Sequence, residues 1–304
     1  MSQNIKAHLA LLFTNLFFAA NYSAVKYFTG NNYAGPFGLN IIRIGVSVIL
    51  FWILFFFNPD RSKIQKKDIM AIAGCALTAI AINQMLFIKG LSLTFPIHAS
   101  LLTLLTPIMI TLIAAIILKE GLTLQKIAGL VLGVSGAVLL IKNKEVVAPG
   151  DNIIEGDTMI LLSAIAYTFY FILVKPLMGK YSAGTVMRWV FTFGFFVIVP
   201  FCTKEFSAIK WNFFAVREWF LLFLLTVPGT FLAYIFNAYG IQKLNASIAG
   251  AYIYSQPVFA VAIAMIFLKE HLTLHKIIAA LLIFAGVYLS RSKTEHSSPE
   301  EHPL

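Results

Sequence analysis

The chain has 304 residues, of which 59% are hydrophobic and only 12% are charged. That charged fraction is about half that of ordinary soluble domains, so a water-soluble core cannot absorb the apolar side chains. The formal net charge of +10 lies in loops and suits anionic lipid headgroups. We therefore expect a protein that contacts membrane lipid and binds no nucleic acid.

Ten apolar stretches, each close to the length of about 20 residues that crosses a bilayer as a helix, follow one another along the chain. Breaks such as Gly35-Pro36 and Asn58-Pro59 separate them. The predicted fold class is an all-α integral membrane protein with ten transmembrane helices. The expected spans are 7–28, 37–57, 69–89, 97–118, 124–141, 158–178, 184–203, 218–240, 247–267 and 274–290.

An internal repeat organises these spans. The ten residues Leu118–Ile127 occur again as Leu268–Ile277, with eight identical positions at an offset of 150. The same offset pairs Gly136 with Gly286. Each copy is typical of a tight turn between two helices, with Lys closing one helix and Thr capping the next. The chain is therefore a duplication with a period of half its length.

Five spans per copy is an odd number, so the two copies must enter the membrane from opposite sides. We predict two inverted five-helix repeats, related by a pseudo-two-fold axis in the membrane plane. The first repeat is expected at residues 1–145 and the second at 157–291. A connecting loop at 146–156 joins them, and a disordered cytoplasmic tail follows at 292–304.

Lys and Arg in the loops indicate the orientation. With the N-terminus inside, twelve of them fall on the cytoplasmic side and nine on the other, and the densest cluster, Arg61–Lys67, is cytoplasmic. We therefore expect a multi-pass protein of a cell membrane with both termini in the cytoplasm. The sequence leaves the oligomeric state open.

At this point the sequence resembles the EamA type of the drug/metabolite transporter superfamily. The resemblance rests on the ten spans, the duplication, and the repeated Leu-Lys-Glu-x-Leu-Thr-Leu-x-Lys-Ile motif after a proline-bearing helix, over about residues 7–290. It implies a small-metabolite carrier, often an exporter, in a bacterial inner membrane. It also implies a central cavity surrounded by spans 1, 3, 4, 6, 8 and 9. The sequence departs from the family at Ala20-Asn21-Tyr22, where many members carry a Trp-Gly pair.

The acidic residues fall outside the middle of every predicted span, with Asp68, Asp157 and Glu218 at helix starts, where the helix dipole favours them. Carboxylates carry protons in many pumps. Their absence from the spans favours facilitated transport or exchange, while a relay through His98 stays open. His98 is otherwise interpreted as a solvated or structural side chain near the start of span 4.

Arg43 and Arg188 are the charged residues placed furthest inside spans, about two turns from a helix start. Each can anchor its helix at the headgroups by extending its guanidinium to the membrane surface. Alternatively, each can recognise an anionic or zwitterionic substrate, since Arg binds a carboxylate in a fork. The sequence leaves both interpretations open.

Polar side chains deep in the spans face protein or a cavity, because lipid cannot satisfy them. Such residues either hold helices together or form a hydrogen-bonding cavity wall. Thr106-Pro107 and Gln256-Pro257 are repeat mates, and matched helix breaks near the midplane point to a substrate site unless they are only structural kinks. Including two tyrosines that are equally compatible with ordinary packing, the expected substrate contacts are Asn21, Arg43, Asn83, Gln84, His98, Thr103, Thr106, Tyr167, Tyr170, Arg188, Tyr234, Asn237, Tyr252, Tyr254 and Gln256.

These features predict a secondary transporter of small polar or amphipathic metabolites, with amino acids and related zwitterions as candidates and export as the expected direction. It would work by alternating access around a midplane cavity. We expect no catalytic residues, cofactor or metal site, because paired carboxylates are missing from the middle of the predicted spans and Glu-x-x-His spacings are missing from the sequence. A membrane-embedded transferase and a channel are the alternatives.

Overall fold

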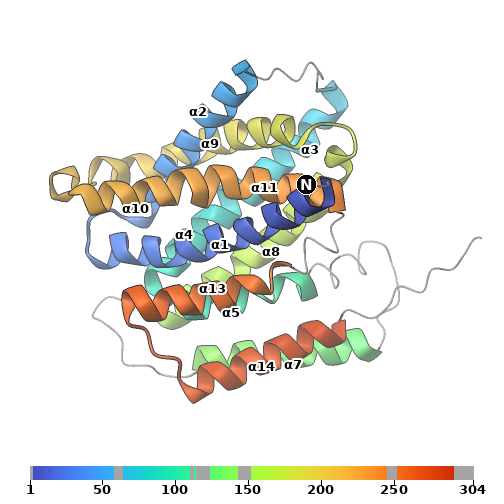
Figure 1. Ribbon diagram of the computed structural model, residues 1–304, viewed down its shortest axis with the longest axis vertical. Helices are drawn as coiled ribbons and strands as arrows, with labels where there is room; N and C mark the ends of the chain where they lie inside the picture. Colours follow the sequence, from blue (N-terminus) through green and yellow to red (C-terminus); the bar gives the residue numbers. More distant parts are fainter. Residues whose placement is uncertain are drawn as a thin grey trace, which may run out of the picture.

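The computed structural model describes residues 3–57, 64–109, 113, 124–142, 152–244 and 252–290, and these ranges are helical without strands (Figure 1). Three short segments, η1, η3 and η4, are π-helical, and η2 is a 3-10 turn. The elements are α1 (Gln3–Gly30), α2 (Pro36–Phe57), α3 (Lys66–Ala76), η1 (Leu77–Gln84), α4 (Met85–Leu93), α5 (Pro96–Thr103), α7 (Leu124–Lys142), α8 (Ile153–Met178), α9 (Ala183–Ser207), η2 (Trp211–Phe213), α10 (Val216–Thr226), η3 (Val227–Leu232), α11 (Ala233–Leu244), α13 (Ser255–Ile263), η4 (Ala264–Leu268) and α14 (Leu274–Ser290).

The helices are built for a bilayer. Six helical runs are long and apolar enough to cross a membrane, and four shorter apolar helices bring the total in the described ranges to ten. Large apolar side chains on the outside stay exposed, and Phe56, Met70 and Val216 each exceed 75% exposure. Such apolar side chains suit contact with lipid tails rather than water. The helices can stand in lipid because they satisfy their own backbone hydrogen-bonding groups. The predicted ten-helix, all-α membrane fold is confirmed.

The helix boundaries differ from the predicted spans mainly at the second half. α8 begins at Ile153, within the expected connecting loop, because Asn152 caps it by accepting a hydrogen bond from the Glu155 backbone N–H at 3.3 Å. Asp157 therefore lies in the second turn of α8 and not at its start. Several predicted segments lie outside the described residues, namely the repeated turn at 118–123, the linker at 146–151, the start of span 9 at 247–251 and the tail at 292–304.

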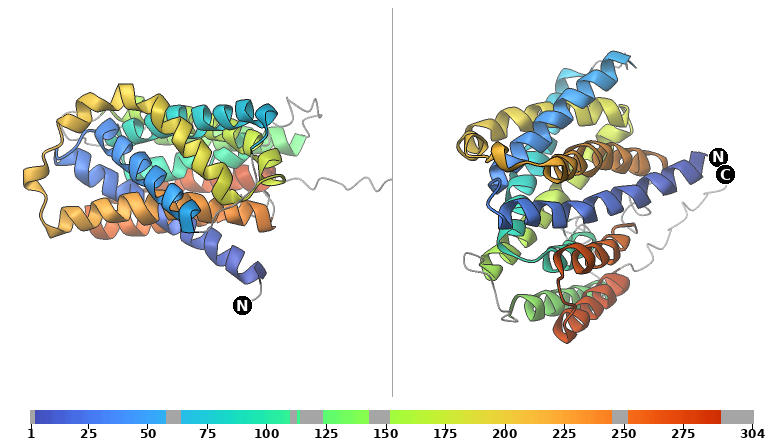
Figure 2. Two further views of the ribbon diagram at one scale, coloured as in Figure 1. Left: turned by 90° about the horizontal axis from the view of Figure 1, so that it is seen from above. Right: turned by 60° about the vertical axis from the view of Figure 1, so that its left-hand side comes forward.

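The two halves pack with two-fold symmetry. α1 packs on α11 and α13, and α8 packs on their mates α4 and α5 in the other half. α2 pairs with α9, and α7 pairs with α14 at one edge of the bundle (Figures 1 and 2). Each helix pair therefore recurs when the halves are exchanged, as an inverted duplication with an odd number of spans requires.

Two glycines show this symmetry at atomic detail. A Cβ added at Gly136 would lie 2.8 Å from the Ala279 carbonyl oxygen, and one added at Gly286 would lie 2.5 Å from the Gly129 carbonyl oxygen. Gly129 and Ala279 are themselves mates at the offset of 150. The repeated glycines therefore let α7 and α14 approach closely at two symmetric points.

Contacts between the halves also fix the helix ends. Glu205, near the end of α9, accepts hydrogen bonds from the backbone N–H groups of Phe37 (2.7 Å) and Gly38 (3.3 Å), so it caps the N-terminus of α2. Glu270 accepts one from the Ile97 N–H at 3.2 Å and caps α5 in the same way. A carboxylate suits a helix N-terminus because it satisfies free N–H groups and the helix dipole.

Candidate functional site

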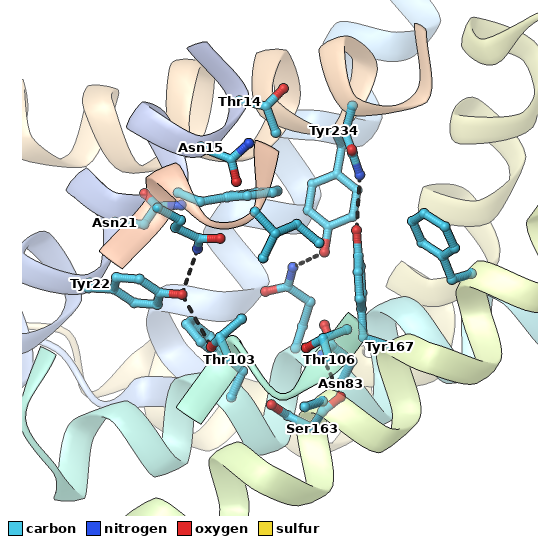
Figure 3. A pocket seen from close by; sticks show the side chains of 18 of the residues that line it. Thr14, Asn15, Asn21, Tyr22, Asn83, Thr103, Thr106, Ser163, Tyr167 and Tyr234 are labelled. Carbon is cyan, nitrogen blue, oxygen red and sulfur yellow. Dashed lines mark hydrogen bonds between the residues drawn. The ribbon is translucent and has the colours of Figure 1, made fainter. Parts of the chain in front are cut away.

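A central cavity lies between the two halves, with about 90 Å³ of space accessible to a water-sized molecule. From the first half, α1, α2, η1, α4 and α5 line it, and from the second half α8, α11 and α13. Figure 3 shows Tyr22 and Thr103 pointing toward each other on one side, with Tyr167 and Tyr234 on the other. The lining residues are Thr14, Asn15, Phe18, Asn21, Tyr22, Arg43, Asn83, Gln84, Phe87, Thr103, Thr106, Ser163, Ala164, Tyr167, Phe171, Tyr234, Asn237, Ile253 and Gln256.

Hydrogen bonds between the halves cross this cavity. Gln256 Nε2 donates to the Tyr22 hydroxyl at 2.6 Å, and that hydroxyl donates to Thr103 Oγ1 at 3.3 Å (Figure 3). Gln84 in η1 donates from Nε2 to the hydroxyl of Tyr234, its repeat mate at the offset of 150. These pairs are weak links between helices, since each is worth only about 0.5–1.5 kcal/mol net. A polar substrate can therefore replace them at modest cost.

A second pair closes the wall beside α8. Asn237 Nδ2 donates to the Tyr167 hydroxyl at 2.9 Å, and Asn83 Nδ2 donates to the Ser163 carbonyl at 2.8 Å. The donors come from α11 and η1 and the acceptors from α8, so the wall is again shared between the halves. Amide and hydroxyl groups in this arrangement offer both donors and acceptors to a small polar molecule.

Ten of the fifteen sequence-predicted residues line this cavity: Asn21, Arg43, Asn83, Gln84, Thr103, Thr106, Tyr167, Tyr234, Asn237 and Gln256. The other five lie elsewhere, and each has an identified structural partner. Arg188 has its guanidinium carbon 3.6 Å from the centre of the Phe55 ring, beside Trp52. Tyr170, one residue off the cavity face of α8, places its hydroxyl 3.8 Å from Met187 Sδ.

His98 is completely buried and paired. Its Nδ1 lies 3.0 Å from Asp157 Oδ2, and Thr94 donates to the other carboxylate oxygen. The His98 side chain is therefore not solvated, and it lies outside the residues that line the cavity, which favours the structural interpretation over a substrate contact. The pair links α5 of the first half to α8 of the second. A buried carboxylate is tolerated here because both of its oxygens have partners.

Tyr252 and Tyr254 stand at the start of span 9. The Tyr252 hydroxyl forms a hydrogen bond with His8 Nδ1 at 2.8 Å, near the first turns of α1. The Tyr254 ring lies 6.2 Å from the ring of Phe284 on α14. Both tyrosines therefore pack helices around the cavity without lining it.

Sequence reasoning missed the face that α1 turns to the cavity. Thr14, Asn15, Phe18, Asn21 and Tyr22 follow the spacing i, i+1, i+4, i+7, i+8, which is one face of a helix. Only Asn21 was expected there. The periodicity of polar residues within an apolar span was the available signal. The same periodicity places Ser163, Tyr167 and Phe171 on the cavity face of α8 and leaves Tyr170 off that face.

Backbone irregularities sit beside the cavity in matching places. Span 4 is interrupted at Leu104–Leu105, just before Thr106-Pro107, and span 9 at 253–254, just before Gln256-Pro257. A proline removes the backbone bond to residue i−4 and its ring clashes with that carbonyl, which explains both interruptions. The π-helical segments η1 and η3 are a second matched pair, in spans 3 and 8, and such segments often occur at functional sites.

Charge in the cavity is one-sided. Among the lining residues in the described part of the chain, Arg43 carries a positive charge. Asp and Glu are missing from that lining. Within the same ranges, no cluster of three or more His, Cys, Asp or Glu residues could hold a metal ion. The lining otherwise consists of amides, hydroxyls and aromatic or aliphatic side chains.

Comparison with known proteins decides the family. The profile described as the EamA-like transporter family matches residues 5–142 and again residues 154–292. The chain belongs to the EamA-like transporter family. It is therefore a multi-pass membrane protein of a family of transporters, as its repeated motif and apolar helices predicted.

Relatives extend over most of the chain. The uncharacterized transporter YetK of Bacillus subtilis is 23% identical over 84% of this chain and 78% of its own length. A probable terminal-alkyne amino-acid exporter of Streptantibioticus cattleyicolor is 26% identical over 95% of this chain and 94% of its own. A solved crystal structure, 17% identical, superposes with a TM-score of 0.60 and covers 92% of this chain and 95% of that one. The chain therefore shares its fold with an experimentally determined protein.

Proposed function

We propose that this protein is a secondary transporter of small polar or amphipathic metabolites that works by alternating access. The observation that carries the proposal is the central cavity, because hydrogen bonds such as Gln256–Tyr22 and Gln84–Tyr234 join the two halves across it. Rocking one half against the other would break pairs such as Gln256–Tyr22 on one side at a time. We further propose that the ten lining residues expected from the sequence contact the substrate.

Amino acids and related zwitterions are the first substrates to test, and export is the proposed direction. The relative named as an amino-acid exporter, which aligns over nearly the whole chain, supports both choices. The relatives reported above are named as transporters, which supports a carrier over an enzyme that uses the cavity for catalysis. We place the protein in a bacterial inner membrane with both termini in the cytoplasm, from the distribution of Lys and Arg.

The test is transport by the purified protein in proteoliposomes. We expect saturable, selective flux of at least one small metabolite, and we expect Thr106→Trp, which fills the cavity, to abolish it without lowering expression or melting temperature. Gly30→Trp is the matched control, because a Cβ at Gly30 meets nothing within 4 Å and the position lies at the end of α1. Flux that is absent for every candidate, or that persists unchanged in Thr106→Trp, would refute the proposal.

A further inference from the structure

Arg43 is held in the membrane by one edge of its guanidinium. The residue is only 2% exposed, in the second turn of α2. Its Nε donates to Thr230 Oγ1 in η3 at 3.0 Å, and the Thr230 hydroxyl in turn donates at 2.8 Å to the carbonyl of Leu225, five residues back in α10. The π-helical segment η3 thus supplies the acceptor that fixes this side chain.

One terminal nitrogen of the Arg43 guanidinium lacks a hydrogen-bond partner in the described part of the chain. Arg43 Nη1 is buried and makes no hydrogen bond, and the same is true of Gln84 Oε1 and Thr106 Oγ1 in the same cavity. Leaving a buried charge uncompensated is costly, far more so than leaving a neutral group. Since no Asp or Glu lines the described part of the cavity, an anion must come from outside the protein to pair with Arg43.

Arg188 lies in different surroundings from Arg43. It is also buried, but its guanidinium stacks on Phe55 and faces Trp52, and it lies away from the central cavity. Aromatic faces stabilise a cation within about 6 Å. Two arginines at similar depths in equivalent helices therefore have different neighbours, and Arg43 is the one that lines the central cavity.

The rest of the cavity suits an apolar body and offers nothing negative to an amine. The Tyr22 and Phe87 rings lie 5.3 Å apart, and the Phe18 and Tyr234 rings lie 5.6 Å apart in an edge-to-face arrangement. A flat or aliphatic group can pack against these rings. A substrate ammonium would meet ring faces and neutral oxygens such as Gln84 Oε1 but no carboxylate of the described lining, and it would feel the repulsion of Arg43.

We propose that Arg43 is the counter-ion of a substrate carboxylate, and that the preferred cargo is a small organic monocarboxylate carrying an apolar group, with net charge −1. A carboxylate can accept two parallel hydrogen bonds from a guanidinium, which is the geometry that a pair of Nη groups offers. The inference rests on the proposed transport function and narrows it, since a zwitterion's amine meets no carboxylate in the described lining of this cavity.

Four probes of one shape test the charge preference in the unmodified protein: 3-phenylpropionate, phenylalanine, 2-phenylethylamine and 3-phenylpropanol. Binding is measured by isothermal titration of the protein in lipid nanodiscs, alongside a thermal-shift screen of aliphatic carboxylates and amines. We expect carboxylates to bind tightest, phenylalanine more weakly, and the amine and the alcohol weakest. If amines or zwitterions bind as tightly as their matched carboxylates, the inference fails while the carrier proposal stands. If nothing in either series binds, both fail.

Variants assign the preference to Arg43. Because a hydrogen bond to a charged group contributes roughly 1.5–3 kcal/mol, Arg43→Gln should weaken carboxylate binding about 10–100-fold and leave alcohol binding nearly unchanged. Arg43→Lys should restore part of the lost carboxylate affinity. Arg217 is exposed at the start of α10, so Arg217→Gln should leave carboxylate affinity unchanged. Equal carboxylate affinity in Arg43→Gln and the unmodified protein would overturn the assignment. Should Arg43→Gln not fold, the probe series in the unmodified protein still decides.

Discussion

Replacing Asp157 by alanine removes a carboxylate that joins the two halves of the bundle. His98 and Asp157 are both fully buried, with Nδ1 and Oδ2 3.0 Å apart, and Thr94 donates to the same carboxylate. Removing one member of a buried pair costs about 3–5 kcal/mol, since the remaining polar groups stay buried without it. At about 2–4 °C per kcal/mol for chains of this size class, the melting temperature should fall by on the order of 10 °C.

A surface pair of similar length provides the matched control. Lys180 Nζ lies 2.9 Å from Asp68 Oδ1, but the Lys180 side chain is 47% exposed. An exposed pair contributes roughly 0–1 kcal/mol, so Lys180→Met should shift the melting temperature by at most a few degrees. Distance alone would predict equal effects for the two pairs, whereas burial predicts a large difference.

The chain carries its own reporter for this measurement. Cys75 and Cys202 are both fully buried, so a thiol-reactive dye should label them only as the helices separate on heating. The fluorescence midpoint then gives the melting temperature of each variant in detergent. Similar shifts for Asp157→Ala and Lys180→Met, or a shift below about 3 °C for Asp157→Ala, would refute the reasoning. The double variant with His98→Ala should lose less than the sum of the single losses, because the two residues share one interaction.

Two further predictions concern packing and the cavity. Gly286→Ala places a Cβ 2.5 Å from the Gly129 carbonyl oxygen, so α7 and α14 must separate. We expect the dye assay to show a loss of about 1–3 kcal/mol in stability, and almost no loss for the control Gly30→Ala. Equal stability of the two variants would contradict the close approach of the helices. Gln256→Leu removes the hydrogen bond to the Tyr22 hydroxyl across the halves. We expect substrate KM in proteoliposomes to rise several-fold, and an unchanged KM would exclude Gln256 from the binding wall.

Composition and the repeat were enough to predict the global fold, because a bilayer imposes both a length and a polarity on each helix. The segment Leu118–Ile127 and its copy gave the period, and an odd number of spans then required inversion. Local breaks were harder. Pro228 marks η3 in the sequence, but η1 contains no proline, so only packing against the other half reveals its π-helical turn.

Some residues of the candidate site could likewise be predicted from the sequence, and others could not. Polar residues in mid-span, such as Gln84 and Gln256, could be selected from the cost of exposing them to lipid, and both line the cavity. Arg43 and Arg188 could not be separated, since their depths in their helices are alike. The neighbours that distinguish them, Thr230 for one and Phe55 for the other, come from distant helices, and single-sequence periodicity contains no information about such contacts.

Counterflow in proteoliposomes tests most directly whether one cavity, shared by two inverted halves, carries the substrate across the membrane. Vesicles loaded with an excess of unlabelled substrate are diluted into labelled substrate, and uptake of label is followed with time. A carrier predicts a transient overshoot, because substrate leaving the cavity speeds its return to the other side, and Thr106→Trp should abolish the overshoot. Uptake that neither saturates nor responds to substrate inside the vesicles would contradict alternating access and indicate a channel.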